Sequence, residues 1–198
     1  MTNRRRFLQI GLAASAWPIA SRAARAAGVG PSPVTVPLYK VVYDARFPES
    51  VAFGRRAEAL GLVTAAIDGD MTRLWYDDLY HRWREGPAAI AGLTAHGALF
   101  CLEQLAWDQR MRVVFRAEHR PGDACVAHDL TGPAEMSAPN VRLEAAGTAW
   151  AERMAELVAR CPSGRTEIVR TAAATPGASF PAAADALYSW VIAPTATV

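Results

Sequence analysis

Ionisable side chains follow each of four predicted strands in this sequence, at the point where each strand ends. An aspartate or a histidine stands at every one of these ends, and both residue types serve as general acids, general bases or metal ligands. Because all strands of a parallel sheet end at the same edge, we expect these side chains to converge there. The residues are Asp44, Arg46, Asp68, Asp70, His96, Glu118, His119 and Arg120.

Two kinds of chemistry fit such a cluster. In a hydrolytic site, His96 or His119 would act as the general base and Asp44 would orient it. In a metal site, Asp68 and Asp70 would supply oxygen ligands beside the imidazoles. The sequence contains no His-Glu-x-x-His or Cys-x-x-Cys spacing that would specify a metal.

The turn Gly92-Leu93-Thr94-Ala95-His96-Gly97 joins a predicted strand to a predicted helix. It lacks the Gly-x-Ser-x-Gly of a nucleophile elbow and the Gly-Lys-Ser/Thr of a P-loop, and no Gly-x-Gly-x-x-Gly follows the first strand. Backbone amides at a helix N-terminus can still hold an anion. We therefore expect Thr94 and Gly97 to contact a bound cofactor, whose identity the sequence does not indicate.

A purely local explanation of the same residues remains open. Asp70 and Thr94 each precede a predicted helix and are natural N-caps, a role worth about 1 kcal/mol without any function. Asp44 can begin a turn through its own side chain. Polar residues are also common at loop starts because loops face water.

Alternating strands and helices must position the cluster. Apolar, β-branched runs predict strands at 38–43, 62–67, 87–93 and 111–117, and helices are predicted at 48–60, 71–84 and 95–109. A long helix at 140–161 and strands at 166–171 and 187–192 follow. This order predicts an α/β fold: a doubly wound, mostly parallel sheet with helices on both faces, plus a C-terminal helix and strand pair.

The N-terminus has the pattern of an export signal, in which a basic start precedes an uncharged run from Ile10 to Ala20. The segment Asn3-Arg4-Arg5-Arg6-Phe7-Leu8-Gln9 resembles the twin-arginine motif Ser/Thr-Arg-Arg-x-Phe-Leu-Lys. The resemblance implies a signal peptide at 1–26, cleavage before Ala27 and export to the periplasm. An extended linker is expected at 27–37, a single domain at 38–198 and a second flexible stretch at 172–184.

Charge and composition exclude two classes of partner. Five of the 21 basic residues belong to the signal, so the mature chain has 16 basic and 19 acidic residues and a net charge of −3. Such a balance gives no support for nucleic-acid binding. The mature chain also contains no second apolar segment of membrane length, so no stable membrane span is expected.

Two functions from different classes remain. The first is a binding or accessory component, such as the small subunit or partner of a redox enzyme co-exported through the twin-arginine route, which carries folded proteins. The alternative is a small periplasmic hydrolase or metal-assisted enzyme at the strand ends. Of the three cysteines, Cys101 is expected to be buried in its helix, whereas Cys125 and Cys161 are expected to pair after export.

The export signal gives the first testable prediction. Replacing the arginine cluster (Arg4→Lys, Arg5→Lys and Arg6→Lys) should leave the precursor in the cytoplasm, because the match to the export motif rests on these side chains. Cell fractionation with an antibody against the mature domain measures this. Undiminished protein in the periplasm would contradict the assignment.

Overall fold

The structure is a computed structural model that describes residues 34–136, 143–164, 167–178 and 186–195. The expected signal peptide 1–26, most of the linker 27–37, and parts of the expected segments 140–161, 166–171 and 172–184 lie outside these residues. Pro33–Val198 forms one unit. Within the part that is described, no helix is both long and apolar enough to cross a membrane.

The first half of the unit has parallel strands, as expected. β1 (Leu38–Asp44) lies between β2 (Thr64–Ile67) and β3 (Ala89–Ala95) and pairs with both in parallel. α1 (Pro48–Ala59) connects β1 to β2 and begins with a proline, which suits a first helical turn because it has no N–H to satisfy. β2 and β3 are joined by three short helical segments: α2 (Thr72–Leu74), the π-helical turn η1 (Trp75–Leu79) and α3 (Tyr80–Glu85).

The second half is antiparallel, so the predicted doubly wound, mostly parallel sheet is wrong. α4 (His96–Asp108) leads to β4 (Met111–Pro121), which lies two places from β3 rather than beside it. The strand order is β2-β1-β3-β7-β4-β5-β6, and every pair from β3 onward is antiparallel. The remaining strands are β5 (Cys125–Pro133), β6 (Ile168–Pro176) and β7 (Leu187–Pro194).

A tight hairpin explains the change of direction. The turn residues Gly122, Asp123 and Ala124 follow β4, and the Gly122 amide donates to the Cys125 carbonyl over 2.8 Å. β5 then alternates between buried and more exposed residues, which is the pattern of a strand with one face in the core. Strands joined by so short a turn must be antiparallel.

The C-terminal half departs from the expected long helix and flexible stretch. α5 (Trp150–Val158) begins later than the expected helix 140–161, because Gly147 adopts a φ of 54°, which is outside the range of a regular helix. The short 3-10 turn η3 (Gly147–Ala149) precedes α5. β6 continues to Pro176, into the stretch expected to be flexible. The end of the linker also pairs, since the Val36 amide donates to the Cys161 carbonyl over 2.8 Å.

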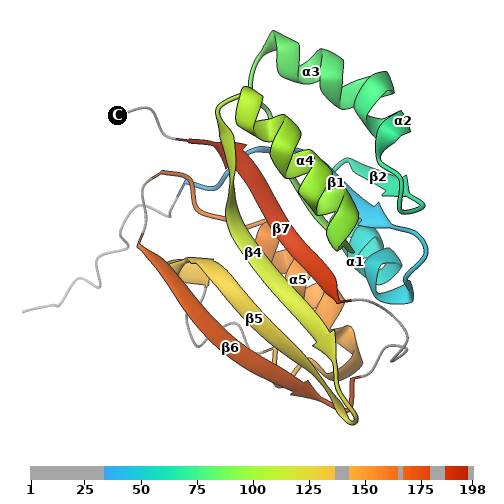
Figure 1. The fold of residues 1–198 in the computed structure, drawn as a ribbon. Coiled ribbons are helices and arrows are strands. Elements are labelled where there is room, and N and C mark those ends of the chain that lie inside the picture. The colour runs from blue at the N-terminus through green and yellow to red at the C-terminus, as the bar shows by residue number, and fades with distance from the viewer. Residues whose placement is uncertain (1–33, 137–142, 165–166, 179–185, 196–198) are drawn as a thin grey trace, which may run out of the picture. The chain divides into compact units, whose positions relative to one another are not determined.

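Helices cover the two faces of the sheet unequally (Figure 1). α1 and α5 pack on one face over a core that includes Phe53, Phe115 and Trp150. α3 and α4 pack on the other face over Trp83 and Trp190, and this cover ends at β4. On that side of β5 and β6, every second residue of β6 from Ile168 to Ala174 is exposed. We call this uncovered surface of β4, β5 and β6 the open face.

Candidate functional site

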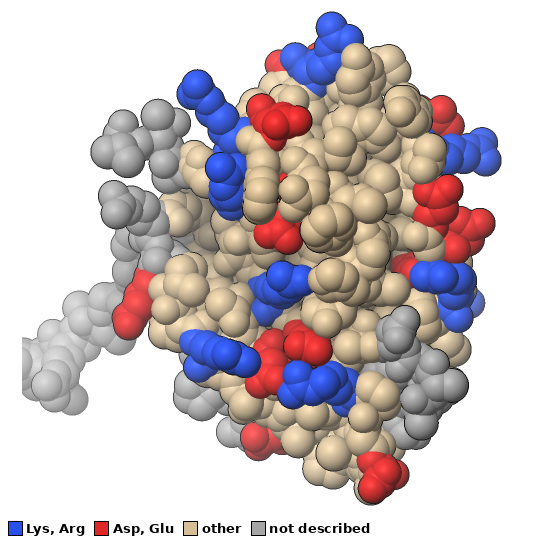
Figure 2. All heavy atoms as spheres, viewed as in Figure 1, with Lys and Arg blue, Asp and Glu red and all other residues tan. Residues whose placement is uncertain are grey.

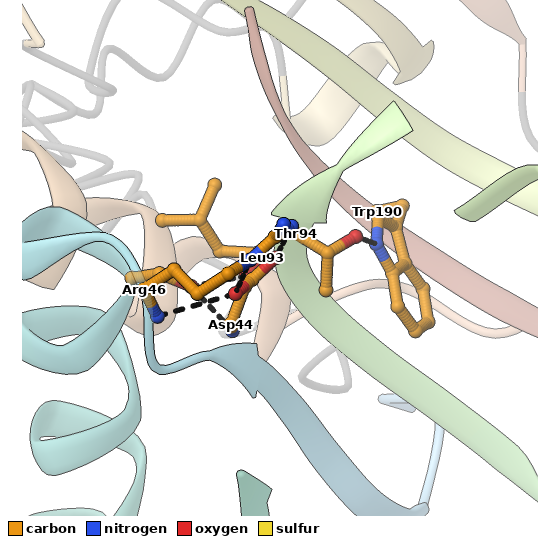
Figure 3. Close-up of polar contacts among 6 residues, drawn as sticks. Asp44, Arg46, Leu93, Thr94 and Trp190 are labelled. Carbon is orange, nitrogen blue, oxygen red and sulfur yellow. Dashed lines mark hydrogen bonds and ion pairs between the residues drawn. The ribbon is translucent and has the colours of Figure 1, made fainter. Parts of the chain in front are cut away.

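Asp44 is held in a local ion pair at the end of β1 (Figure 3). Its Oδ1 accepts from Arg46 Nε over 2.9 Å and its Oδ2 from Arg46 Nη2 over 2.7 Å. The Asp44 backbone amide donates to Ser50 Oγ over 2.8 Å, and Ser50 in turn donates to the Leu93 carbonyl. Because the Asp44 side chain is fully buried and its oxygens are occupied, it is not placed to orient a histidine.

The turn after β3 does not form the expected anion cradle. Thr94 is fully buried, and its Oγ1 accepts from Trp190 Nε1 over 3.1 Å (Figure 3). The cap of α4 is Ala95 rather than Thr94, and no side chain caps this helix. Gly97 is exposed, whereas His96 stacks on Phe100 and meets the edge of Tyr188 on the α4 side of the sheet.

Asp68 and Asp70 line a separate pocket of about 490 Å³ beyond the end of β2, together with Asp77 and Asp78. Asp70 Oδ1 accepts from the Thr72 amide over 2.8 Å, and hydrogen bonds from Thr72 lower the pKa of the Asp70 carboxyl. Among the described residues, no three His, Cys, Asp or Glu side chains are placed to hold a metal ion. The local explanation therefore accounts for Asp70, as a residue that caps the turn leading into α2.

His119 lies on the opposite side of the sheet from His96. It is not past the end of β4 but within it, fully buried against the ring of Trp150 from α5 at 4.6 Å between centroids. Its neighbours in β4, Glu118 and Arg120, point to the open face, where Arg120 pairs with both Glu118 and Asp129. Basic and acidic side chains lie next to one another on this face in Figure 2.

The predicted convergence at the strand ends is therefore wrong. Asp44 forms an ion pair with Arg46, and Asp68 lines the pocket beyond the end of β2. His96 and His119 lie on opposite faces of the sheet. The strand ends do share an edge, but alternation along β4 turns His119 into the core. A longer β4 than the predicted 111–117 is the cause, because it places residue 119 inside the pleat.

His119 instead belongs to a buried chain of hydrogen bonds that the sequence did not reveal. Its Nδ1 lies 2.7 Å from His128 Nδ1, and its Nε2 lies 2.8 Å from Ser189 Oγ. His128 Nε2 lies 2.9 Å from Thr175 Oγ1, which donates to the Leu143 carbonyl over 2.7 Å. These hydrogen bonds link β7, β4, β5 and β6 on the face that α5 covers.

The direction of each proton in this chain follows from Thr175. Its single hydroxyl hydrogen goes to the Leu143 carbonyl, so Thr175 must accept from His128 Nε2–H. A neutral His128 then accepts at Nδ1 from His119 Nδ1–H. His119 Nε2 is left as an acceptor for the Ser189 hydroxyl. Each buried polar atom of the chain is thereby satisfied.

Ser189, His119 and His128 thus have the connectivity of a nucleophile, a base and an orienting group. Ser189, however, is fully buried in the middle of β7, between β3 and β4. A nucleophile needs space beside it for a reacting carbon and for oxyanion donors. The burial of Ser189 makes this chain a structural element of the core.

Burial also fixes the protonation state of the two histidines. It lowers the pKa of His119 well below its usual value, to which the adjacent His128 contributes, and it lowers the pKa of His128 to about 4. Both rings are therefore neutral at neutral pH, which agrees with the tautomers that the hydrogen bonds require.

The larger concave site lies on the open face, at the other end of the strands. A cavity of about 680 Å³ opens where β4 begins and where β5 and β7 end. Its charged groups belong to Glu103 from α4 and Arg116 from β4, and its hydroxyl groups belong to Thr131 from β5 and to Ser163. Aliphatic and proline side chains form most of the remaining wall: Val36, Pro37, Val113, Pro133, Ile168 and Pro194.

Sequence reasoning missed this cavity because it depends on the hairpin. Thr131 pairs with Arg116 across β4 and β5, so the two side chains share a face. The turn residues after β4 and the alternation in β5 were the available signals. Ile168, which lines the cavity, is 58% exposed, so the apolar wall continues to the surface there.

The cysteines also differ from expectation. All three are free thiols, and Cys101 is exposed on α4 rather than buried. Cys125 begins β5, whereas Pro162, next to Cys161, lines the cavity with the last residue of that strand. A nine-residue strand spans roughly 25 Å, far beyond the reach of a disulfide. Burial raises the pKa of the Cys161 thiol to about 12.

No protein-family model matches the sequence, and no curated protein or solved structure is similar to it.

The histidine chain predicts acid sensitivity. Unfolded histidine titrates near pH ~6.5, whereas the folded pKa of His128 is about 4, so the unfolded chain binds more protons between these values. The free energy of unfolding should therefore fall as the pH drops through this window. For His128 alone the loss is about 3 kcal/mol. Urea unfolding curves at a series of pH values measure it.

A double variant separates the contribution of the histidines to this pH dependence from that of the carboxylates, which also titrate in acid. His119→Gln with His128→Gln keeps hydrogen-bonding groups in place but removes both titrations, so its stability should depend less on pH across the same window. His96→Gln, which removes an exposed histidine, should keep the wild-type slope. Equal slopes in all three proteins would contradict the lowered pKa values of the two buried histidines.

Proposed function

We propose that this protein is an exported binding component of the periplasm, which holds a small ligand in the cavity of the open face and serves a co-exported partner. The observation that carries the proposal is the cavity itself. Its volume of about 680 Å³ is within the range of about 300–1,000 Å³ that is usual for small-molecule sites.

The lining supports binding rather than reaction. Most of it is aliphatic, with a few polar groups that can fix the orientation of a ligand. Neither a histidine nor a cysteine lines it, and its hydroxyl groups, Thr131 and Ser163, have no histidine beside them in that lining. A nucleophile–base pair is therefore not part of this cavity as the described residues form it.

The surroundings of the cavity support a protein partner. Phe100 and Trp107 are exposed on α4 beside the open face, and Arg112 lies over the ring of Trp107. Aromatic and arginine side chains are enriched at protein interfaces. The twin-arginine motif adds to this support, since that route carries proteins already folded and can carry a partner with them.

The alternative function, a small hydrolase or metal-assisted enzyme, rests on weaker support. Asp44, His96 and His119 would have to meet at one edge, and the structure places them apart. The Ser189–His119 contact has the geometry of an activated hydroxyl, but no substrate reaches a fully buried strand residue. The enzyme alternative therefore lacks a site in the part of the chain that the structure describes.

Filling the cavity tests the binding function. Thr131→Trp places a large ring where the cavity is lined, whereas Ala127→Trp adds the same ring on the same face of β5, away from the lining. We expect the apolar dye 1-anilinonaphthalene-8-sulfonate to bind the wild-type protein and Ala127→Trp saturably, with one site. Thr131→Trp should weaken this binding at least about tenfold, since the ring occupies the ligand volume.

Fluorescence titration gives the dissociation constants, and urea unfolding confirms that both variants fold. Thr131 is exposed and Ala127 is half-buried, and an aromatic residue suits such strand positions, so neither change should prevent folding. Absence of saturable dye binding to the wild-type protein would refute the proposed function, as would equal binding by both variants.

A further inference from the structure

Two opposite charges line the cavity without pairing with one another. Glu103 extends from α4 and Arg116 from β4, and both contribute to the wall. The ion pairs among the described residues include neither of them. Neither charge is therefore neutralised by an ion pair among the described residues, and both residues are available to a ligand in the cavity.

The Arg116 guanidinium is positioned by an aromatic ring. Its guanidinium carbon lies 5.3 Å from the centroid of the Tyr188 ring, and the Tyr188 hydroxyl donates to Glu118 over 3.2 Å. Stacking on a ring orients a guanidinium and leaves its N–H groups free to donate to a carboxylate. Thr131, the cross-strand partner of Arg116, adds a hydroxyl to the same wall.

The rest of the lining sets the shape of the ligand. It is aliphatic, proline or glycine, apart from Ser163, whose hydroxyl donates to the Val34 carbonyl over 2.8 Å. Proline has no N–H to donate, so this wall favours hydrocarbon. A ligand with only an anionic group would leave Glu103 desolvated without a partner, and a pure hydrocarbon would do the same to both charges.

We propose that the cavity binds a small zwitterion with an aliphatic body, the chemistry of an apolar amino acid or a short apolar peptide. The carboxylate contacts Arg116 and Thr131, the ammonium contacts Glu103, and the aliphatic body lies against Val113 and Ile168. This assignment rests on the proposed binding function and adds the class of ligand.

Matched ligands test the charges one at a time. Isothermal titration calorimetry of the mature protein compares leucine and leucyl-leucine with 4-methylpentanoate, which lacks the ammonium, and 3-methylbutylamine, which lacks the carboxylate. The better of the two zwitterions should bind at least about tenfold more tightly than either singly charged analogue, because a charge-assisted contact is worth this much. The preferred zwitterion distinguishes an amino acid site from a peptide site.

Variants assign each charge to its residue. Arg116→Gln should weaken the zwitterion and 4-methylpentanoate at least about tenfold and leave 3-methylbutylamine unchanged, and Glu103→Gln should do the reverse for the two analogues. Arg55→Gln on α1 and Asp123→Asn in the hairpin turn are matched controls, since both are exposed and neither lines the cavity. These controls should bind as the wild-type protein does.

Two results would overturn the inference. The first is 4-methylpentanoate binding as tightly as the zwitterions with no effect of Glu103→Gln. The second is failure of both zwitterions to bind while the dye still binds, which would reject the ligand class and leave the binding function standing. Failure of the dye as well would reject both.

Discussion

The position of β7 between β3 and β4 determines the rest of the structure. β7 pairs antiparallel with both neighbours and so joins a parallel half to an antiparallel half. Its side chains alternate between two cores: Trp190 faces α4 and donates to Thr94, whereas Ser189 faces α5 and donates to His119. Trp190 also requires Gly92, since a Cβ there would lie 2.5 Å from the ring. Side chains of this one strand thus hydrogen-bond to Thr94 and His119, which would otherwise be candidates for a catalytic site.

Separation of polar groups between the two ends of the sheet favours binding over catalysis. At the carboxyl ends of the parallel strands, the polar groups of Asp44 and Thr94 already have partners inside the protein. In the cavity that opens where β4 begins, Arg116 and Glu103 line a largely aliphatic wall, and neither has an ion-pair partner among the described residues. Charges left without partners beside a cavity are available to a ligand, whereas satisfied ones stabilise the fold.

Most elements could be predicted from the sequence, but their pairing could not. The strands near 38–43 and 187–192 and the helices near 48–60 and 95–109 are present, because apolar periodicity is a local signal. The direction of β7 depends on contacts with strands almost a hundred residues away, such as Gly92 with Trp190, which no local pattern contains. The cavity could not be predicted for the same reason. Asp68 and Asp70 could be found as polar residues at a strand end, whereas the cavity forms only where the β4–β5 hairpin, the C-terminus of β7 and α4 come together.

Backbone chemical shifts of the isotope-labelled mature protein, followed by NMR as leucine or leucyl-leucine is added, test the central claim most directly. If the open face is the binding site, the largest changes occur at Val113, Thr131 and Ile168, which line the cavity on three different strands. Changes centred on Asp68, Asp70 and His96, at the carboxyl ends of the parallel strands, would place the site where the sequence alone suggested it. That result, or shifts unchanged by either ligand and by the dye, would contradict a binding site on the open face.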